Sequence, residues 1–407
     1  MNLITLILCI AMAFGFSDFL TERSPRLQRD IYYVAFGVVA FLFTIKYYYG
    51  PDILSYVPFY EKIPPIGQIL AHPDKIPYTF EPGFAIFCRI LKDWGVSFYW
   101  MTAIVSLFYF GVIALLFKNI DRKRSFALAI LVVLDYKCIF ATYRQCLSVA
   151  CFVLFVLCLR DRRYIGAVVC ALLTAAFHKS GAFVVAVVLF YYMVRSRMVQ
   201  PYLYQLLLVV LVLVFLLPIA NVSTPFVSHL PLPASFRDSI IHHLGLGRQV
   251  QVVFLIYAAT LVCITHFTQH SHTRAESIAA TALVGLAMVV VLYQYYYLLV
   301  RLRSYFLPIV IVYLFRTIQT SEDSGQHIPY GQLIKQAASL LVFVYLAHSA
   351  YSFHAGTLQL KNNVYNDCTV FCLSGKKVTD VRTAQLRLAE RYWKEDFMKN
   401  EQNKIKH

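Results

Sequence analysis

The stretch SFYWMTAIVSLFYFGVIALLF, residues 97–117, decides the fold class, because one helix of about 20 uncharged residues can cross a bilayer. Similar apolar runs fill most of the 407-residue chain. In total 59% of the residues are hydrophobic and only 14% are charged, whereas soluble domains approach a quarter charged. No strand-like alternation at barrel spacing is apparent, and in lipid only helices or closed barrels satisfy the backbone. The sequence therefore predicts an all-α, polytopic integral membrane protein.

About twelve apolar segments are candidate membrane spans, with boundaries that carry an error of a few residues. They run over 3–19, 31–49, 97–117, 126–141, 145–159, 164–177, 181–194, 202–220, 250–268, 277–299, 303–318 and 333–351. The segments between 126 and 194 are joined by very short hinges, which predicts a compact bundle with tilted or partial helices. The first segment has no basic residues before its apolar core, so we expect a retained span and not a cleaved signal peptide.

Basic residues gather in every second loop, which indicates the orientation of the chain. They follow the first, third, fifth and seventh spans, as Arg23, Arg26, Arg29, Lys118, Arg122, Lys123, Arg124, Arg160, Arg162, Arg163, Arg195 and Arg197. The positive-inside rule places these loops in the cytoplasm. The loops at about 50–96 and 221–249 then face the periplasm, or the outside of a cell with one membrane. Residues 1–351 form one transmembrane domain, and 352–407 form a charged tail whose side stays open.

The net charge of +16 is also explained by the basic residues in the cytoplasmic loops, so nucleic-acid binding is not expected. Basic cavities for anionic lipid headgroups are a second use of such charges, and membrane lipid is an expected partner.

A second set of charged side chains lies at the outer ends of the spans, where the positive-inside rule predicts few cations. This set comprises Arg144, His178, Lys179, Arg301 and Arg303 at span ends, with Asp52, Glu61 and Glu81 between the second and third spans. A charge within a span costs about 2.5–3.5 kcal/mol on insertion scales, so such residues are functional candidates. Guanidinium groups match phosphate oxygens in a planar, bidentate way, which predicts a phosphate or pyrophosphate ligand. Arginines that only anchor helix ends at the membrane boundary are the alternative.

His178 lies between an apolar helix and a Lys-Ser-Gly turn. Neighbouring cations would favour the neutral imidazole that a general base requires, although a hydrogen-bonded packing role is the alternative. Arg301 and Arg303 are two residues apart, so on a helix they point to different faces. Only one of them is expected to enter a cavity.

Several common catalytic motifs are missing from the sequence. It has no Walker loop, GxGxxG, HExxH or GxSxG in a convincing setting, and no CxxC pair. No separate nucleotide-binding domain is apparent either. We therefore expect no cofactor and no metal ion, and a donor that is already activated in the membrane.

Five stretches carry a resemblance to the EpsG family of the Wzy-type polysaccharide polymerases. They are GPDILSYVPFYE at 50–61, EPGFAIFCRIL at 81–91, YRQCLSVA at 143–150, AFHKSG at 176–181 and VRLRSYFLPI at 300–309. Each stretch is weak alone, but their order and spacing make the resemblance fairly specific.

The resemblance implies a GT-C-like or Wzy-like bundle in the bacterial inner membrane. It implies a metal-independent glycosyltransferase that polymerises undecaprenyl-pyrophosphate-linked oligosaccharide repeats at the periplasmic face, with a chain-length regulator as a candidate partner. Arg144 and His178 become the leading catalytic candidates, with Arg301 in support. The residues expected to line the site or bind substrate are Asp52, Glu81, Gln145, Lys179 and Arg303.

The general base stays open between His178 and a carboxylate, Asp52 or Glu81. Arginines at the site would stabilise the charge on the departing pyrophosphate. A flippase for the same lipid-linked unit is an alternative function, although it should carry repeat-related halves and polar residues near the midplane. An O-antigen ligase-like transferase is another, and a membrane acyltransferase would need a cytoplasmic route for its donor.

Overall fold

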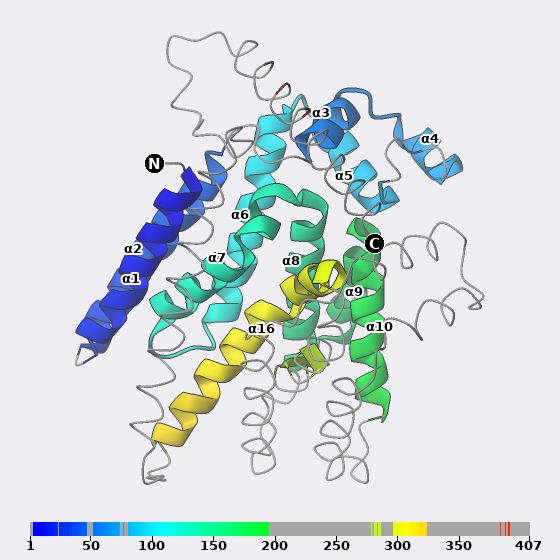
Figure 1. The fold of residues 1–407 in the computed structure, drawn as a ribbon. Coiled ribbons are helices and arrows are strands. Elements are labelled where there is room, and N and C mark those ends of the chain that lie inside the picture. The colour runs from blue at the N-terminus through cyan, green and yellow to red at the C-terminus, as the bar shows by residue number, and fades with distance from the viewer. Residues whose placement is uncertain are drawn as a thin grey trace, which may run out of the picture. The chain divides into compact units, whose positions relative to one another are not determined.

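Every regular element that the structure describes is a helix (Figure 1). The computed structural model describes residues 3–22, 24–46, 52–73, 76, 80–194, 278, 281, 282, 284, 285, 296–323, 383, 387 and 390. Outside these lie the predicted spans at 202–220, 250–268 and 333–351, most of 277–299, the predicted loop at 221–249 and nearly all of the tail at 352–407. The chain forms two compact units, the first with residues 1–150, 176–178 and 318–407, and the second with 151–175 and 179–317.

Each span predicted before residue 195 corresponds to one helix. These helices are α1 (Leu3–Leu20), α2 (Pro25–Thr44), α6 (Phe98–Phe117), α7 (Arg124–Ala141), α8 (Tyr143–Arg160), α9 (Tyr164–Phe177) and α10 (Lys179–Val194). Within the described residues, α6 and α8 are long and apolar enough to cross a membrane, and residues 6–20, 164–177 and 179–191 form shorter apolar helices. The total of about twelve spans stays a prediction.

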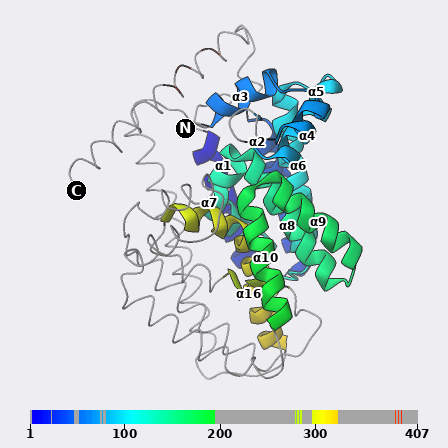
Figure 2. The same ribbon diagram turned by 90° about the vertical axis from the view of Figure 1, so that its right-hand side faces the viewer.

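The predicted loop at 50–96 contains three helices. They are α3 (Ile53–Glu61), α4 (Ile66–Ala71) and α5 (Pro82–Asp93), which lie together beyond one end of α6 (Figures 1 and 2). In α5 the buried residues are Phe84, Ala85, Cys88 and Leu91. Their spacing of three and four residues is that of an amphipathic helix, and the segment was too short and too polar to be recognised as a span.

The predicted boundary between the spans at 277–299 and 303–318 is wrong. Helix α16 runs without interruption over Tyr296–Asp323 and includes Arg301 and Arg303. No glycine or proline occurs between 296 and 307, so nothing in the sequence ends a helix there. The two arginines suggested a boundary by their charge alone.

Helix α7 lies against α1 and α2 in the core of the first unit (Figure 1). A Cβ at Gly15 of α1 would lie only 2.9 Å from the Ala129 Cβ of α7, so glycine permits this close approach. Phe43 at the end of α2 packs its ring 5.2 Å from that of Phe110 and 4.4 Å from that of Phe140. These rings join α2 to α6 and α7.

Distant side chains cap both ends of α7. The Asp18 Oδ2 accepts a hydrogen bond from the Phe126 N–H in the first turn, at 2.9 Å. The Lys46 Nζ donates to the Ile139 carbonyl in the last turn, at 2.6 Å, and Lys46 is fully buried. Each charge complements the helix dipole at its own end. The chain leaves α7 at Ala141 and reaches Arg144 three residues later, so Lys46 fixes the approach to that arginine.

Candidate active site

Arg144 lies in the first turn of α8 and is held by two other segments of the first unit. Its Nη1 forms an ion pair with the Glu81 Oε2 at 2.6 Å, and its Nε–H donates to the Tyr56 hydroxyl at 3.3 Å. The Arg144 side chain is 22% exposed and that of Glu81 only 6%. A charge-assisted bond in such a shielded place is strong, so the guanidinium is held in one orientation. Its two hydrogen bonds use two of the five N–H donors that a guanidinium carries.

Aromatic rings form the wall behind this guanidinium. The Arg144 Cζ lies 4.0 Å from the Phe80 ring centroid and 5.8 Å from that of Tyr56. Phe80 in turn packs edge-on against Phe59 and Phe84, at 4.7 and 5.9 Å. Cation–π attraction adds to the ion pair, and the rings exclude water from one face of the arginine.

The Tyr56 hydroxyl accepts the hydrogen bond from Arg144 and stays protonated at neutral pH. Burial raises the pKa of Tyr56 to about 12, although the nearby Arg144 acts in the opposite direction. Tyr56 therefore contributes no ionised group to the site and acts there as a neutral partner of the guanidinium.

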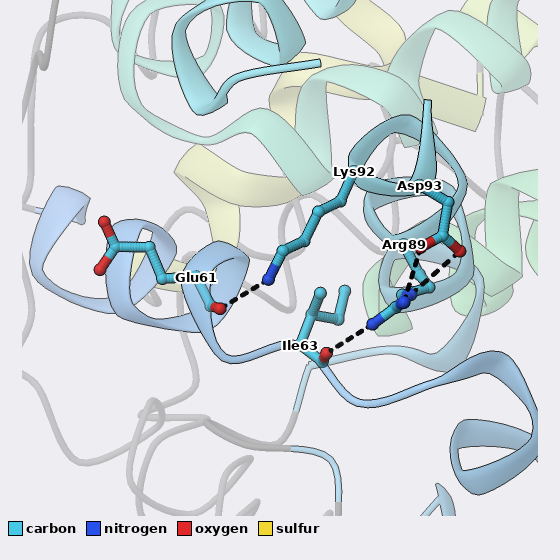
Figure 3. A network of polar contacts seen from close by, with 5 residues as sticks. All are labelled: Glu61, Ile63, Arg89, Lys92 and Asp93. Carbon is cyan, nitrogen blue, oxygen red and sulfur yellow. Dashed lines mark hydrogen bonds and ion pairs between the residues drawn. The ribbon is translucent and has the colours of Figure 1, made fainter. Parts of the chain in front are cut away.

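A polar clamp holds α3 against α5 (Figure 3). The Lys92 Nζ donates to the Glu61 carbonyl at 2.6 Å, and the Arg89 Nη1 donates to the Ile63 carbonyl at 3.2 Å. Arg89 is itself fixed by Asp93, with 2.6 Å between Nη2 and Oδ1. The clamp joins the C-terminal end of α3, the helix of Tyr56, to α5, the helix that begins after Glu81. Figure 3 shows the Glu61 carboxylate directed away from both cations, so only its backbone takes part.

His178 lies between α9 and α10, in a segment that contacts the first turns of α5. A Cβ at Gly83 would lie 2.6 Å from the Ala176 Cβ and 2.7 Å from the Ala176 carbonyl oxygen. The Phe177 and Phe87 rings are 6.0 Å apart. Glu81 is the N-cap residue of α5, so these contacts bring the half-buried His178 to the same end of α5 as the Arg144–Glu81 pair.

The model of the EpsG family matches residues 31–362, which is most of the chain. The chain belongs to the EpsG family. This family consists of polysaccharide polymerase-like membrane proteins. The matched range includes Tyr56, Glu81, Arg144 and the 176–178 segment, so the whole candidate site lies within the family region. No curated protein and no solved structure matches the chain significantly.

The eight site residues predicted from this EpsG-family sequence fall into both units. Asp52, Glu81, Arg144, Gln145 and His178 belong to the first unit, and Lys179, Arg301 and Arg303 to the second. In the first unit Gln145 is buried beside Arg144, and Asp52 is the half-buried N-cap residue of α3. The convergence of all eight on one site stays a prediction.

In the second unit, the Ser180 and Tyr305 hydroxyls are 3.1 Å apart and join the first turn of α10 to α16. Lys179 precedes Ser180, and Arg301 lies one turn before Tyr305. Arg301 is exposed and Arg303 half-buried, which agrees with the expectation that they point to different faces.

Sequence reasoning missed three side chains of this EpsG-family site: Tyr56, Phe80 and Lys46. Lys46 lies 4.9 Å from the ring centroid of Tyr143, the residue before Arg144. Tyr56 follows Asp52 by four residues on α3, and this helical spacing within the 50–61 motif was the available signal for it. Within the described residues, no group of three or more His, Cys, Asp or Glu residues could hold a metal ion.

Proposed function

We propose that this EpsG-family chain polymerises undecaprenyl-pyrophosphate-linked oligosaccharide repeats by block glycosyl transfer at the periplasmic face of the bacterial inner membrane. The observation that supports the proposal most is the shielded Arg144–Glu81 pair, with 2.6 Å between Nη1 and Oε2. A guanidinium fixed by a carboxylate and by ring faces needs no reorganisation when a phosphorylated substrate arrives. The remaining donors of Arg144 suit two oxygens of one phosphate.

In the proposed reaction, a hydroxyl oxygen of the incoming repeat attacks the anomeric carbon that joins the growing chain to its lipid pyrophosphate. The new glycosidic C–O bond forms while the bond from the anomeric carbon to the pyrophosphate oxygen breaks. The hydroxyl proton passes to a general base, and the lipid pyrophosphate leaves as an anion. Arg144 stabilises the charge that develops on this leaving group, and Arg301 supports it.

Glu81 and His178 are the two proposed bases, with Asp52 as a further carboxylate. Glu81 has a fixed position relative to Arg144, so a hydroxyl bound to its carboxylate would lie next to a pyrophosphate bound to the arginine. His178 reaches the same end of α5 through the contacts of Ala176 and Phe177. Gln145, Lys179 and Arg303 are proposed to bind the sugar and phosphate groups around them.

The role of Arg144 can be tested in cells that make polysaccharide with this protein. We expect Arg144→Ala to abolish the ladder of polymer lengths on a gel, with the protein level unchanged on an immunoblot. Arg144→Lys keeps the charge but loses the planar fork, so we expect a strongly reduced ladder. Arg160→Gln is the matched control, since it removes an arginine from the other end of the same helix, where an exposed pair with Asp161 is lost. Full-length polymer from Arg144→Ala would refute the proposed role.

A further inference from the structure

A basic cavity lies at the end of α7 that is remote from Arg144. Its volume is about 250 Å³, and it is lined by Pro25, Arg26, Gln28, Arg29, Asp121, Lys123 and Arg124. Helix α7 extends from Arg124 to Ala141, which corresponds to roughly 27 Å at 1.5 Å per residue. The cavity and the Arg144 site are therefore separate places in the first unit.

The lining of the cavity carries four cations and one carboxylate. Three of the cations have partners among neighbouring groups of the same unit. The Arg124 Nε donates to the Ile120 carbonyl, the Lys123 Nζ pairs with Glu22 at 3.1 Å, and the Arg29 Nε pairs with Asp30 at 3.5 Å. The buried Gln28 amide donates to the Asp18 carbonyl at 2.7 Å, so the wall between α1 and α2 is also fixed. The four cations exceed the three neighbouring carboxylates, Asp121, Glu22 and Asp30, so the cavity keeps a positive charge.

Helix α2 begins at this cavity and adds to its positive field. It starts at Pro25, and its N-cap residue Ser24 forms no side-chain cap, whereas the first turn of α7 is already capped by Asp18 through the Phe126 N–H. A helix N-terminus carries partial positive charge from its aligned peptide dipoles. Cations and helix N-termini together form the usual environment of a bound phosphate group.

Apolar side chains next to the cavity indicate which phosphate compound fits. Leu20 ends α1 and is 73% exposed, and Leu27 lies between the cavity residues Arg26 and Gln28 and is 47% exposed. Tyr33 and Val34 extend this exposed apolar surface one to two turns further along α2. Because α1 and α2 are predicted spans, acyl chains cover these side chains in the membrane, and the cavity lies where the phosphate group of such a lipid would reach it.

We propose that this cavity binds the phosphate group of an anionic membrane lipid, whose acyl chains lie along the exposed apolar surface of α1 and α2. The cavity lies among the basic residues that the positive-inside rule assigns to the cytoplasmic side, and the cytoplasmic leaflet is enriched in anionic lipids. The bound lipid would anchor the starts of α2 and α7 at the membrane surface opposite the Arg144 site. The lipid-binding cavity is independent of the proposed polymerase reaction.

Native mass spectrometry of the purified full-length protein in detergent tests this proposal. The probes are phosphatidylglycerol, phosphatidylcholine and inorganic phosphate, each added to delipidated protein. We expect phosphatidylglycerol to remain bound at concentrations where phosphatidylcholine and inorganic phosphate do not. Arg26→Gln/Arg29→Gln should weaken its retention on the order of tenfold, because two cations at the phosphate are lost.

The matched control is Lys118→Gln/Arg122→Gln, which removes two cations from the loop before α7 without changing the cavity lining. We expect this variant to retain phosphatidylglycerol as the unchanged protein does. Arg26→Gln alone keeps three of the four cavity cations. If the double variant does not insert into the membrane, this single variant should show a smaller loss of phosphatidylglycerol retention. Equal binding of phosphatidylcholine, preference for inorganic phosphate over the lipid, or equal losses in the two double variants would each overturn the proposal.

Discussion

The Arg144 guanidinium is shielded from water by the Glu81 carboxylate, the Tyr56 phenol and the Phe80 ring. Burying a charge is costly unless a partner compensates for the lost hydration, and Glu81 is that partner. The pair is therefore interdependent, and removal of either side chain leaves the other charge without compensation. This makes it necessary to separate a structural role of Glu81 from a chemical one.

Glu81→Gln makes this separation, because the amide keeps the size of the side chain and an oxygen that can accept from Arg144. If Glu81 is the general base, we expect the polymerisation rate to fall by about 10²–10⁴ while binding of the lipid-linked repeat persists. The rate is measured with purified protein, and binding with a labelled repeat. A rate close to that of the unchanged protein would assign Glu81 to orientation of Arg144 and leave His178 or Asp52 as the base.

At this scale the sequence drew attention to the charged residues of the candidate site but not to the groups that hold them. Arg144 and Glu81 were predicted because a charge beside an apolar run is expensive and therefore conspicuous. Phe80 and Tyr56 are typical residues of any interfacial segment, and only tertiary contact brings them to the guanidinium. Lys46 lies near the end of the predicted span at 31–49, where a lysine usually extends toward water, so its bond to the Ile139 carbonyl was not foreseeable.

Helix α5 and the α9–α10 turn approach each other so closely that Gly83 has no room for a side chain. An added Cβ would overlap both the Ala176 side chain and its carbonyl group, so the backbone next to His178 must move. We expect Gly83→Ala to destabilise the fold by about 1–3 kcal/mol, and to reduce the polymer ladder. Thermal unfolding in detergent measures the first effect.

Gly67→Ala in α4 is the matched control, since nothing lies within 4 Å of its added Cβ. In an open helical position alanine is favoured over glycine by up to about 1 kcal/mol, so this variant should be neutral or slightly stabilised. If Gly83→Ala is as stable as Gly67→Ala and gives an unchanged polymer ladder, the close packing of the 176–178 segment on α5 is not required for function.

Hydropathy predicted the long helices well because each is bounded by a charged or polar turn. Helix α2 differs from the predicted span, because it begins at Pro25 and not at 31. Proline in the first turn is a common helix start. Helices α3 to α5 were not predicted, because short amphipathic segments do not form an apolar run of membrane length. Their arrangement depends on the clamp of Arg89 and Lys92, which sequence spacing does not reveal.

At the scale of the whole molecule, the proposal requires His178 and Arg301 to lie on the same side of the membrane. We expect single cysteines at positions 178 and 301 to react with a membrane-impermeant maleimide added from outside, in a background with the native cysteines replaced by serine. A cysteine at 122, in a basic loop, should react only after the membrane is opened. Labelling of 178 and 301 from opposite sides would contradict the topology.

Block polymerisation can be tested in a reaction that contains only the purified protein and a defined undecaprenyl-pyrophosphate-linked repeat, with EDTA present and no nucleotide. We expect a ladder of products that differ by one repeat unit, together with release of the lipid pyrophosphate. No product longer than the starting repeat, from protein that is folded and binds the substrate, would contradict it.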